Sequence, residues 1–304
     1  MQKKVEDIKI EKDMSLKDLI DEMYEAGGFT GKKMALGLNI LEKMEKEECY
    51  KFLSFPACII ATGTRGVIKD LIKNKLFDCI ITTCGTLDHD LARIWKDYYH
   101  GDFNLDDVKL HREGINRLGN VLVPNESYGI ILEEKLQKIF EKIENKDYSS
   151  KELIWEIGKN ISSKDSIVYW AYKNKIPIFI PGITDGAFGF QLWMYAQENK
   201  LRVDPLKDET ELSEVIYSAK KTGALMIGGG ISKHHTIWWN QFRGGLDYAV
   251  YITTAPEWDG SLSGARVREG VSWGKIKENA KYVTIEGDAT IILPILTLAL
   301  LQKL

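Results

Sequence analysis

Apolar runs that end in small or hydroxylated residues recur along this chain of 304 residues. They are rich in β-branched and aromatic side chains, and helical patterns separate them, which is the strand–helix–strand rhythm of a parallel sheet. Parallel strands bring their carboxyl ends to one edge of a sheet, where ligands bind in open α/β folds. The sequence therefore predicts an α/β fold with a doubly wound, mostly parallel, Rossmann-like sheet. The expected strands are Ala57–Thr62, Phe77–Thr83, Ile176–Ile180, Ala224–Ile227 and Tyr248–Thr254.

The N-terminal stretch has a different pattern, with two amphipathic helices and no apolar strand. Ser15 can cap a helix that runs past Glu22, and Thr30 can cap another that runs to Glu45. We expect residues 1–50 to form a helical N-terminal extension and residues 51–304 to form one α/β domain. Within that domain, the irregular stretch from 95 to 125 predicts a functional excursion, because it is neither low in complexity nor highly charged.

Composition excludes several classes of protein. A formal net charge of -3 leaves no broad basic field, so a nucleic-acid partner is not expected. The four cysteines lack CxxC spacing, which predicts neither a zinc site nor a disulfide framework and suits a reducing cytoplasm. No apolar stretch is long enough for a membrane span. The longest, Ala289–Leu301, contains Pro294 and predicts a core or subunit-interface helix.

Two stretches are candidates for chemistry. After the strand that ends near Thr254, a loop rich in Gly, Ser and Asp leads into a short helical stretch that places Glu269, Trp273 and Lys275 together. A desolvated lysine can attack an electrophilic carbon such as an imine, whereas a solvated lysine at a helix end is the simpler alternative. The run Gly228–Gly230 lies between a strand and a helix, so it is either a dinucleotide phosphate turn or only a tight turn.

Four runs of the sequence resemble deoxyhypusine synthase, and the resemblance extends from about residue 15 to the last helix. The runs are GGGISKHH at 228–235, TTAPEWDGSLSGARVREGVSWGKI at 253–276, PGITDGAFG at 181–189 and INRLGNVLVPNESY at 115–128. The resemblance implies that NAD oxidises spermidine to an imine and that an active-site lysine takes up the 4-aminobutyl group. This group then passes to a lysine of the translation initiation factor 5A precursor, and the hydride returns. The family also implies a homotetramer with shared sites, in the cytoplasm.

The resemblance assigns roles to individual residues. The nucleophilic lysine matches Lys275, and the proton-handling histidine matches His234. The polyamine pocket matches Glu269 and Trp273, and we add Asp259, Ser261 and His89 as substrate-binding residues. Lys233 matches no catalytic position and is expected to be a surface or helix-start residue. For NAD, in residues 51–304, the matching positions are Thr83, Cys84, Gly85, Asp185, Gly229, Thr254, Ala255, Asp288 and Ala289. No metal is implied.

The chain also departs from the family pattern. Phe190 and Leu262 stand where eukaryotic members have polyamine-binding aspartates, and His89 replaces an acid. The phosphate-side loop reads ATGTRG, with Arg65, instead of a Ser-Asn stretch. Loss of two carboxylates weakens polycation binding unless other acids compensate. The candidates are Asp88, Asp90, Glu257 and Asp259. Two alternatives stay open: a homospermidine-synthase-like enzyme that transfers the group to a small diamine, and a non-catalytic NAD-binding paralogue.

Overall fold

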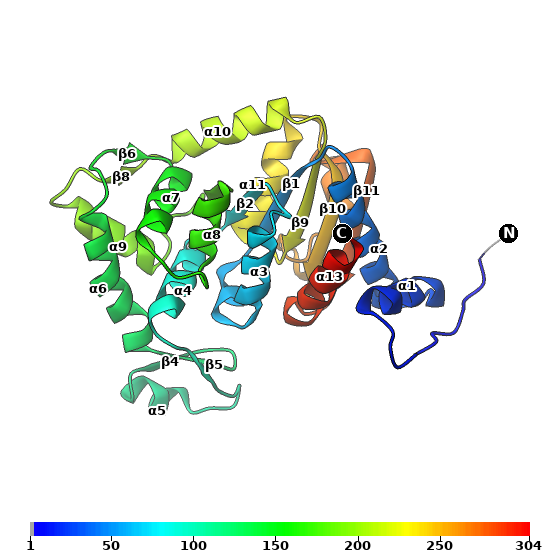
Figure 1. Ribbon diagram of the computed structural model, residues 1–304, viewed down its shortest axis with the longest axis horizontal. Helices are drawn as coiled ribbons and strands as arrows, with labels where there is room; N and C mark the ends of the chain where they lie inside the picture. The colour runs from blue at the N-terminus through cyan, green and yellow to red at the C-terminus, as the bar shows by residue number, and fades with distance from the viewer. Residues whose placement is uncertain (1–2) are drawn as a thin grey trace. The chain divides into compact units, whose positions relative to one another are not determined.

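The computed structural model describes residues 3–304 and has the predicted α/β class (Figure 1). The chain divides into two compact units, each built from segments that are not contiguous in the sequence. The first consists of Met1–Phe55, Leu76–Asp78 and Ser213–Leu304, and the second of Pro56–Lys75 and Cys79–Leu212. The boundary expected near residue 50 stays a prediction, because this division follows a different criterion.

Parallel strands form the centre of the first unit. They lie in the order β11 (Ile276–Glu286), β10 (Leu246–Thr253), β9 (Thr222–Ile227) and β1 (Tyr50–Phe55). Leu225 of β9 is in register with Leu53 of β1 and with Val250 of β10. β9 and most of β10 are buried, as their continuous apolar runs require when both faces of a parallel sheet are covered. The strands predicted at 224–227 and 248–254 are therefore confirmed.

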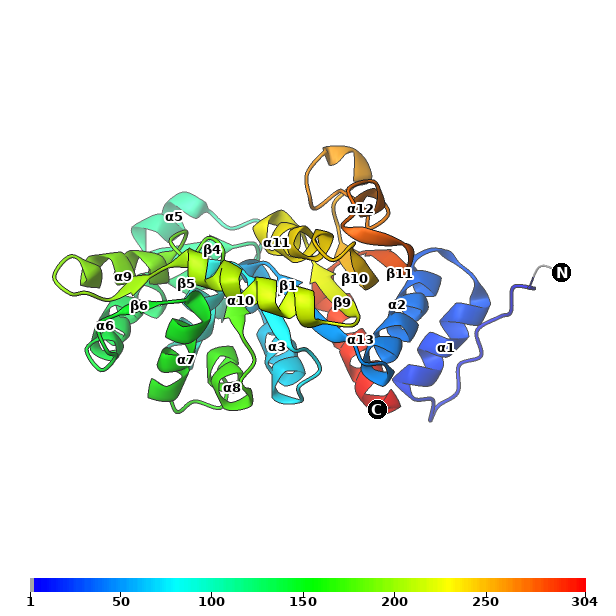
Figure 2. The ribbon, with the colours of Figure 1, turned by 90° about the horizontal axis from the view of Figure 1, so that it is seen from above.

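Helices cover both faces of this sheet, as the doubly wound prediction requires. Val250 approaches Gly37 of α2 (Phe29–Lys46), whereas the ring of the next residue, Tyr251, lies under Lys233 of α11 (Gly230–Gln241). Successive side chains of a strand point to opposite faces, so α2 and α11 lie on opposite sides. Figure 2 shows this arrangement, with α13 (Ala289–Lys303) on the side of α2. α1 (Leu16–Ala26) packs beside α2 and α13.

The second unit contains the parallel pair β2 (Cys79–Thr82) and β7 (Ile178–Phe179) with helices around it. The stretch expected to be a functional excursion is an antiparallel three-stranded sheet, β3 (Tyr99–His100), β5 (Val121–Pro124) and β4 (Ile115–Leu118), with α5 (Asp107–Arg112). A short parallel pair joins β6 (Asp147–Tyr148) to β8 (Arg202–Val203). The helices are α3 (Thr64–Lys73), α4 (Cys84–Trp95), α6 (Gly129–Phe140), α7 (Ser150–Asn160), α8 (Ile167–Asn174) and α9 (Ala187–Ala196), and α10 (Pro205–Ser218) spans the boundary between the units.

Two local predictions are wrong. The strand expected at Ala57–Thr62 is a 3₁₀ helix at Ala57–Ala61, and the true strand β1 precedes it. Pro56 separates the two segments, since proline cannot donate a ladder hydrogen bond. Thr30 lies inside α2, whose N-cap is Gly28, although the Ser15 cap of α1 is confirmed.

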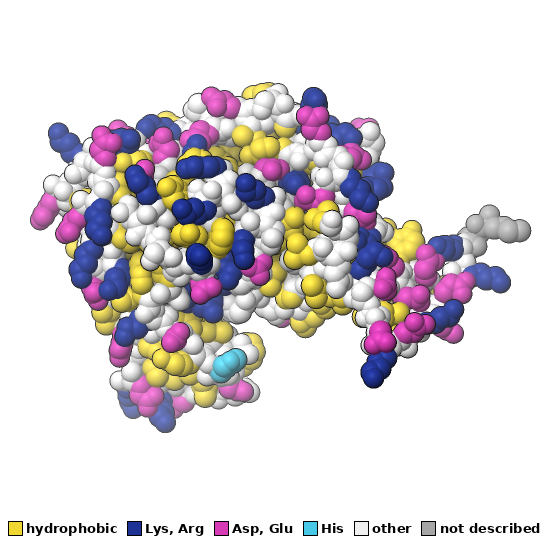
Figure 3. All heavy atoms as spheres, in the orientation of Figure 1, with side chains coloured by type: hydrophobic (Ala, Val, Ile, Leu, Met, Phe, Trp, Pro, Cys, Tyr) yellow, Lys and Arg dark blue, Asp and Glu magenta, His cyan; other side chains and the backbone are white. Residues whose placement is uncertain are grey.

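Among residues 3–304, no helix is both long and apolar enough to cross a bilayer, and no three potential ligand side chains gather as a metal site. None of the four cysteines is assigned to a disulfide bond within residues 3–304. On the face seen in Figure 3, basic and acidic side chains are interspersed, as the near-balanced composition predicts.

Candidate active site

A cavity of about 150 Å³ in the first unit brings together several of the predicted site residues. Its walls come from α11, from the loop after the 3₁₀ turn Glu257–Asp259, and from the turn between α12 (Glu269–Ser272) and β11. The side chains that line it include Lys233, Leu262, Arg266, Glu269, Trp273 and Lys275. Three of the predicted side chains, Lys275, Glu269 and Trp273, thus share one cavity.

The backbone fixes Lys275 at the start of β11. Its amide donates to the Gly270 carbonyl (2.9 Å), and its carbonyl accepts from the Leu246 amide of β10 (3.0 Å). α12 is a single turn, because Gly274 adopts φ 67° in the left-handed region and redirects the chain into the strand. The helical stretch predicted to carry Lys275 therefore ends before it.

The Lys275 side chain is only 9% exposed, and its Nζ lies 5.2 Å from the ring centre of Trp273. Within residues 3–304, this amine has no hydrogen bond or ion pair with another side chain. The alternative of a solvated lysine at a helix end is wrong.

Lys233 lies in the first turn of α11, as the helix-start alternative predicts, but it is buried in the opposite wall of the cavity and is not a surface residue. The side chain is 2% exposed, and its Nζ donates to the carbonyls of Leu262 (2.7 Å) and Ala265 (2.6 Å). The same Nζ lies 3.7 Å from the ring centre of Tyr251. Burial lowers the pKa of Lys233 to about 7, although the charge of Glu269 opposes the shift.

Four successive carbonyls of the loop 262–265 each accept a hydrogen bond from a side chain. Lys233 binds the first and the fourth, the Tyr251 hydroxyl donates to the Ser263 carbonyl (2.7 Å), and Arg266 donates to the Gly264 carbonyl (2.7 Å). The glycine turn also packs on this loop, because a Cβ at Gly229 would lie 2.4 Å from the Ser263 amide nitrogen. The loop is therefore held by its backbone and does not depend on its own side chains.

His234 is half-buried, on the turn of α11 next to Lys233. Burial lowers its pKa, and the positive charge of Lys275 lowers it further. The imidazole is thus neutral near pH 7 and can accept a proton. Glu269 is exposed at the rim of the cavity and is the only acidic residue among the described residues that line it.

The other acids near this loop have local partners. The Asp259 carboxylate accepts from the amide and the hydroxyl of Ser261 (both 2.8 Å), so both predicted substrate-binding residues sit in one exposed turn. Glu257 forms an ion pair with Arg268. These contacts are solvent-exposed and weak, so a cationic ligand can compete for both carboxylates.

Five of the predicted cofactor residues follow the carboxyl ends of three adjacent strands of the first unit. Gly229 follows β9, Thr254 and Ala255 follow β10, and Asp288 and Ala289 follow β11. Asp288 caps α13 by accepting from the Thr290 amide (2.8 Å), which leaves its second oxygen open. The residues present fit a dinucleotide, with glycine backbone at a helix start and an exposed carboxylate along one edge.

The remaining cofactor residues lie in the second unit, after the carboxyl ends of β2 and β7. Thr83, Cys84 and Gly85 begin α4, and Asp185 is exposed in the turn before α9. Burial raises the pKa of the Cys84 thiol, and the nearby Asp88 raises it further. Cys84 therefore remains a thiol and offers packing, not nucleophilic chemistry.

Two of the acids expected to compensate for the missing aspartates are structural. Asp88 is 1% exposed and accepts from the Tyr128 hydroxyl (2.7 Å) and from the Phe188 amide (2.7 Å) at the start of α9. Asp90 is fully buried and caps α8 through Ser166 and the Ile167 amide. Neither can bind a polyamine, because their oxygens are already bonded away from solvent.

His89 carries no negative charge, so it cannot pair with a cation as the acid of the family pattern would. Its Nδ1 lies 2.9 Å from the Tyr98 hydroxyl, and burial together with the charge of Arg93 lowers its pKa to about 4. The neutral ring lines a second cavity of about 680 Å³, within the second unit, beside Tyr128 and Phe190. The two departures from the family pattern thus line different cavities, with Leu262 near Lys275 and Phe190 near His89.

Sequence reasoning missed two residues near Lys275. Lys233 looked like a solvated lysine, because its partners are carbonyls 29 and 32 residues away. Trp238 was not singled out, although its spacing of four from His234 places both rings on one helix face.

Comparison with known proteins gives a consistent result. A family model described as deoxyhypusine synthase matches residues 18–300. A protein of Picrophilus torridus described as a probable deoxyhypusine synthase is 56% identical over 301 residues, covering 98% of this chain and 97% of its own. One of Thermoplasma acidophilum with the same description is 55% identical over 295 residues, covering 96% and 95%.

Solved structures agree at the level of the fold. The crystal structure of an Entamoeba histolytica protein described as a deoxyhypusine synthase superposes with a TM-score of 0.66 at 20% sequence identity. The match covers 97% of this chain and 96% of the other.

Proposed function

This chain belongs to the deoxyhypusine synthase family of transferases, and we propose that it moves the 4-aminobutyl group of spermidine through Lys275 to a lysine of the translation initiation factor 5A precursor. The observation that carries this proposal is the Lys275 amine, buried against Trp273 without an anionic partner in the described chain. Such an amine is placed to attack an electrophilic carbon such as that of an imine.

The transfer step needs a base, an amine and a dry cavity. His234, neutral near pH 7, accepts the proton of the spermidine secondary amine as the carbon–nitrogen bond is oxidised. The Lys275 nitrogen then attacks the imine carbon. Its new bond to that carbon replaces the bond to 1,3-diaminopropane, which leaves with a proton, so this exchange neither gains nor loses electrons. Closed surroundings limit hydrolysis of the imine.

NAD, when bound, supplies the hydride acceptor and later the hydride donor. We propose that the backbone at Gly229 approaches its phosphates and that Asp288 accepts a ribose hydroxyl. Thr254, Ala255 and Ala289 would form the rest of this edge. The family resemblance also assigns Thr83, Cys84, Gly85 and Asp185 to NAD. The exposed Asp288 and the glycine turn at the start of α11 support this assignment.

The donor's ammonium groups need anions, and this chain offers fewer than the family pattern. Glu269 at the cavity rim and Asp259 in its exposed turn are the carboxylates that we propose to hold them, with Ser261 as a further polar contact. Trp273, 64% exposed, can cover the methylene chain. We propose that the neutral His89 gives an uncharged contact to a substrate bound in the second cavity.

We also propose that the chain assembles as the homotetramer of its family and works in the cytoplasm. α13 supports the assembly, because Ile291 is 62% exposed and Leu298 is 49% exposed on this apolar helix. Exposed apolar surface of this kind is typical of interfaces. The four cysteines, none of them assigned to a disulfide bond within residues 3–304, support the reducing location.

The test is covalent trapping. The chain is incubated with NAD and isotopically labelled spermidine, treated with borohydride and digested for mass spectrometry. We expect an aminobutyl mass on Lys275 that requires NAD and disappears in Lys275→Arg. Lys277→Arg is the matched control, because Lys277 lies two residues further on and pairs with Asp247. An undiminished adduct in Lys275→Arg would refute the role of Lys275.

The acceptor is tested separately with the purified factor and with putrescine at equal concentration. We expect label on the factor and no release of homospermidine. Transfer to putrescine alone would identify the homospermidine-synthase-like enzyme, and binding of NAD without any adduct would identify a non-catalytic paralogue.

A further inference from the structure

Trp238 contacts both side chains to which the proposed function gives chemical roles. The His234 ring lies 5.8 Å from the Trp238 ring, centre to centre, at an interplanar angle of 21°. The Lys275 Nζ lies 5.9 Å from the centre of the same indole. One aromatic side chain thus joins a residue of α11 to a residue at the start of β11.

The helix fixes the orientation of this indole. His234, Trp238 and Phe242 follow one another at intervals of four on α11, so their rings lie along one face. The Trp238 and Phe242 rings form a T-shaped pair, with 5.6 Å between their centres and an interplanar angle of 88°. The indole is therefore stacked on one side and braced on the other, although 40% of it is exposed.

The Lys275 nitrogen needs such a neighbour because no carboxylate in the described chain contacts it. The Lys275 nitrogen attacks as a neutral amine and becomes positively charged when it forms the protonated imine with the 4-aminobutyl group. Trp273 and Trp238, at 5.2 and 5.9 Å, offer ring faces that attract a cation without neutralising it.

We propose that Trp238 is a positioning residue, which holds the His234 imidazole by stacking and the cationic Lys275 nitrogen by its ring face. The inference rests on the proposed transfer through Lys275. It assigns to α11 one residue more than the family resemblance assigned, and it explains how the site keeps a cation without an acid.

The experiment compares variants that remove the ring with one that keeps it. Trp238→Leu and Trp238→Met lack a ring, and Trp238→Phe retains one. Phe242→Leu is the packing control, since it removes the brace of Trp238 but touches neither His234 nor Lys275 in the contacts above. The full-length protein is used with NAD and labelled spermidine, and the rate of borohydride-trapped adduct on Lys275 is measured alongside circular dichroism.

We expect the ring-less variants to form adduct about tenfold more slowly, Trp238→Phe to stay within about threefold of the unchanged protein, and Phe242→Leu within about twofold. A folded ring-less variant with an unchanged rate would overturn the role of Trp238. So would an equal loss in the Leu and Phe variants, since that indicates shape instead of the ring. If the unchanged protein itself forms no adduct, the proposed function fails first and takes this inference with it.

Discussion

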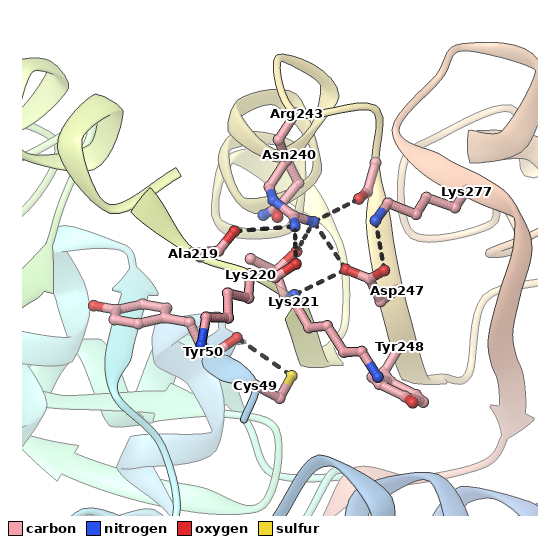
Figure 4. A network of polar contacts seen from close by, with 12 residues as sticks. Cys49, Tyr50, Ala219, Lys220, Lys221, Asn240, Arg243, Asp247, Tyr248 and Lys277 are labelled. Carbon is pink, nitrogen blue, oxygen red and sulfur yellow. Dashed lines mark hydrogen bonds and ion pairs between the residues drawn. The ribbon is translucent and has the colours of Figure 1, made fainter. Parts of the chain in front are cut away.

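Lys275 and Lys277 are two residues apart, but their amines have opposite surroundings. The Lys277 Nζ lies 2.5 Å from the Asp247 carboxylate, which also binds Arg243 at 2.9 Å (Figure 4). The Lys275 Nζ faces two tryptophan rings and forms no ion pair with a carboxylate of residues 3–304. One short segment thus carries a lysine whose amine is paired with an acid of the fold and a lysine whose amine faces aromatic rings.

The network around Asp247 stabilises the fold, because the charged groups of Arg243, Asp247 and Lys277 all have hydrogen-bond or ion-pair partners. Arg243 donates to the carbonyls of Ala219 and Lys220, and Asp247 accepts from the Thr222 amide (3.0 Å), so α11 and β10 are tied to the start of β9 (Figure 4). The cavity around Lys275 instead uses carbonyls and aromatic faces. We therefore expect substitutions in the Asp247 network to change stability, and substitutions at Lys275 to leave stability nearly unchanged.

The largest expected effect is loss of the acid in the network. Asp247→Ala leaves the Arg243 and Lys277 charges without a carboxylate in a mostly buried place, and we expect the free energy of unfolding to fall by about 3 kcal/mol. Urea denaturation measures it. Lys275→Met serves as the comparison, because its amine has no partner to orphan, and it should change stability by less than about 1 kcal/mol. Equal losses in the two variants would contradict this expectation.

Lys233 lines the same cavity as Lys275, but its buried amine bonds to backbone carbonyls and so stabilises the fold. Lys233→Met leaves the Leu262 and Ala265 carbonyls without their donor. We expect a loss of about 2 kcal/mol in urea denaturation, together with slower adduct formation, because the loop loosens. Lys220→Met, at an exposed lysine on the other side, should be nearly neutral. Wild-type stability in Lys233→Met would show that the carbonyls find other donors.

The pH dependence of stability separates the same two regions. The pKa of Lys233 falls from 10.5 in the unfolded chain to about 7 in the fold, so between these values the unfolded chain binds more protons. Stability should therefore rise with pH, by about 1 kcal/mol from pH 7.5 to 8.5. Lys233→Met should lack this rise.

Asp247 contributes in the opposite range. Burial works against its charged form, but bonds from Lys277, Thr222 and Arg243 outweigh burial and lower its pKa below 3.8. Its contribution to stability is present above pH 3.8 and is lost as the pH falls through the lower pKa of the folded state.

For Lys233, a urea midpoint that stays constant across the alkaline range in the unchanged protein would contradict the assignment.

The smallest expected effect comes from returning an acid to the reactive cavity. Leu262→Asp places a carboxylate where the family pattern has one, and we expect spermidine to bind about threefold more tightly by calorimetry. Leu262→Asn, similar in shape but uncharged, is the control. Equal affinity in the two variants would mean that Glu269 and Asp259 already satisfy the ligand.

The sequence predicted most of the regular structure because long apolar runs define strands independently of context. It failed at the first strand, where YKFLSF and ACIIA are adjacent short runs and the mixed one, not the apolar one, pairs in the sheet. Short apolar runs do not distinguish a strand from a turn of helix. Strand neighbours decide, and Tyr50 to Ser54 align with β9.

The candidate site was predictable in membership but not in surroundings. Lys275, Glu269 and Trp273 are close in sequence and share a cavity, whereas the partners of Lys233 come from a distant loop. Asp88 and Asp90 looked available because their helix pattern is ordinary. Their carboxylates cap α9 and α8, nearly 80 to 100 residues onward, and no local pattern reports that.

The contact between Gly229 and the Ser263 backbone has an evolutionary consequence. Every other amino acid carries a Cβ, and at this position that atom would lie 2.4 Å from backbone nitrogen. The neighbouring loop cannot yield, because side-chain donors hold its carbonyls from 262 to 265. Any substitution of Gly229 is therefore disfavoured by selection, and another residue can replace it only after the loop 262–265 has changed its conformation.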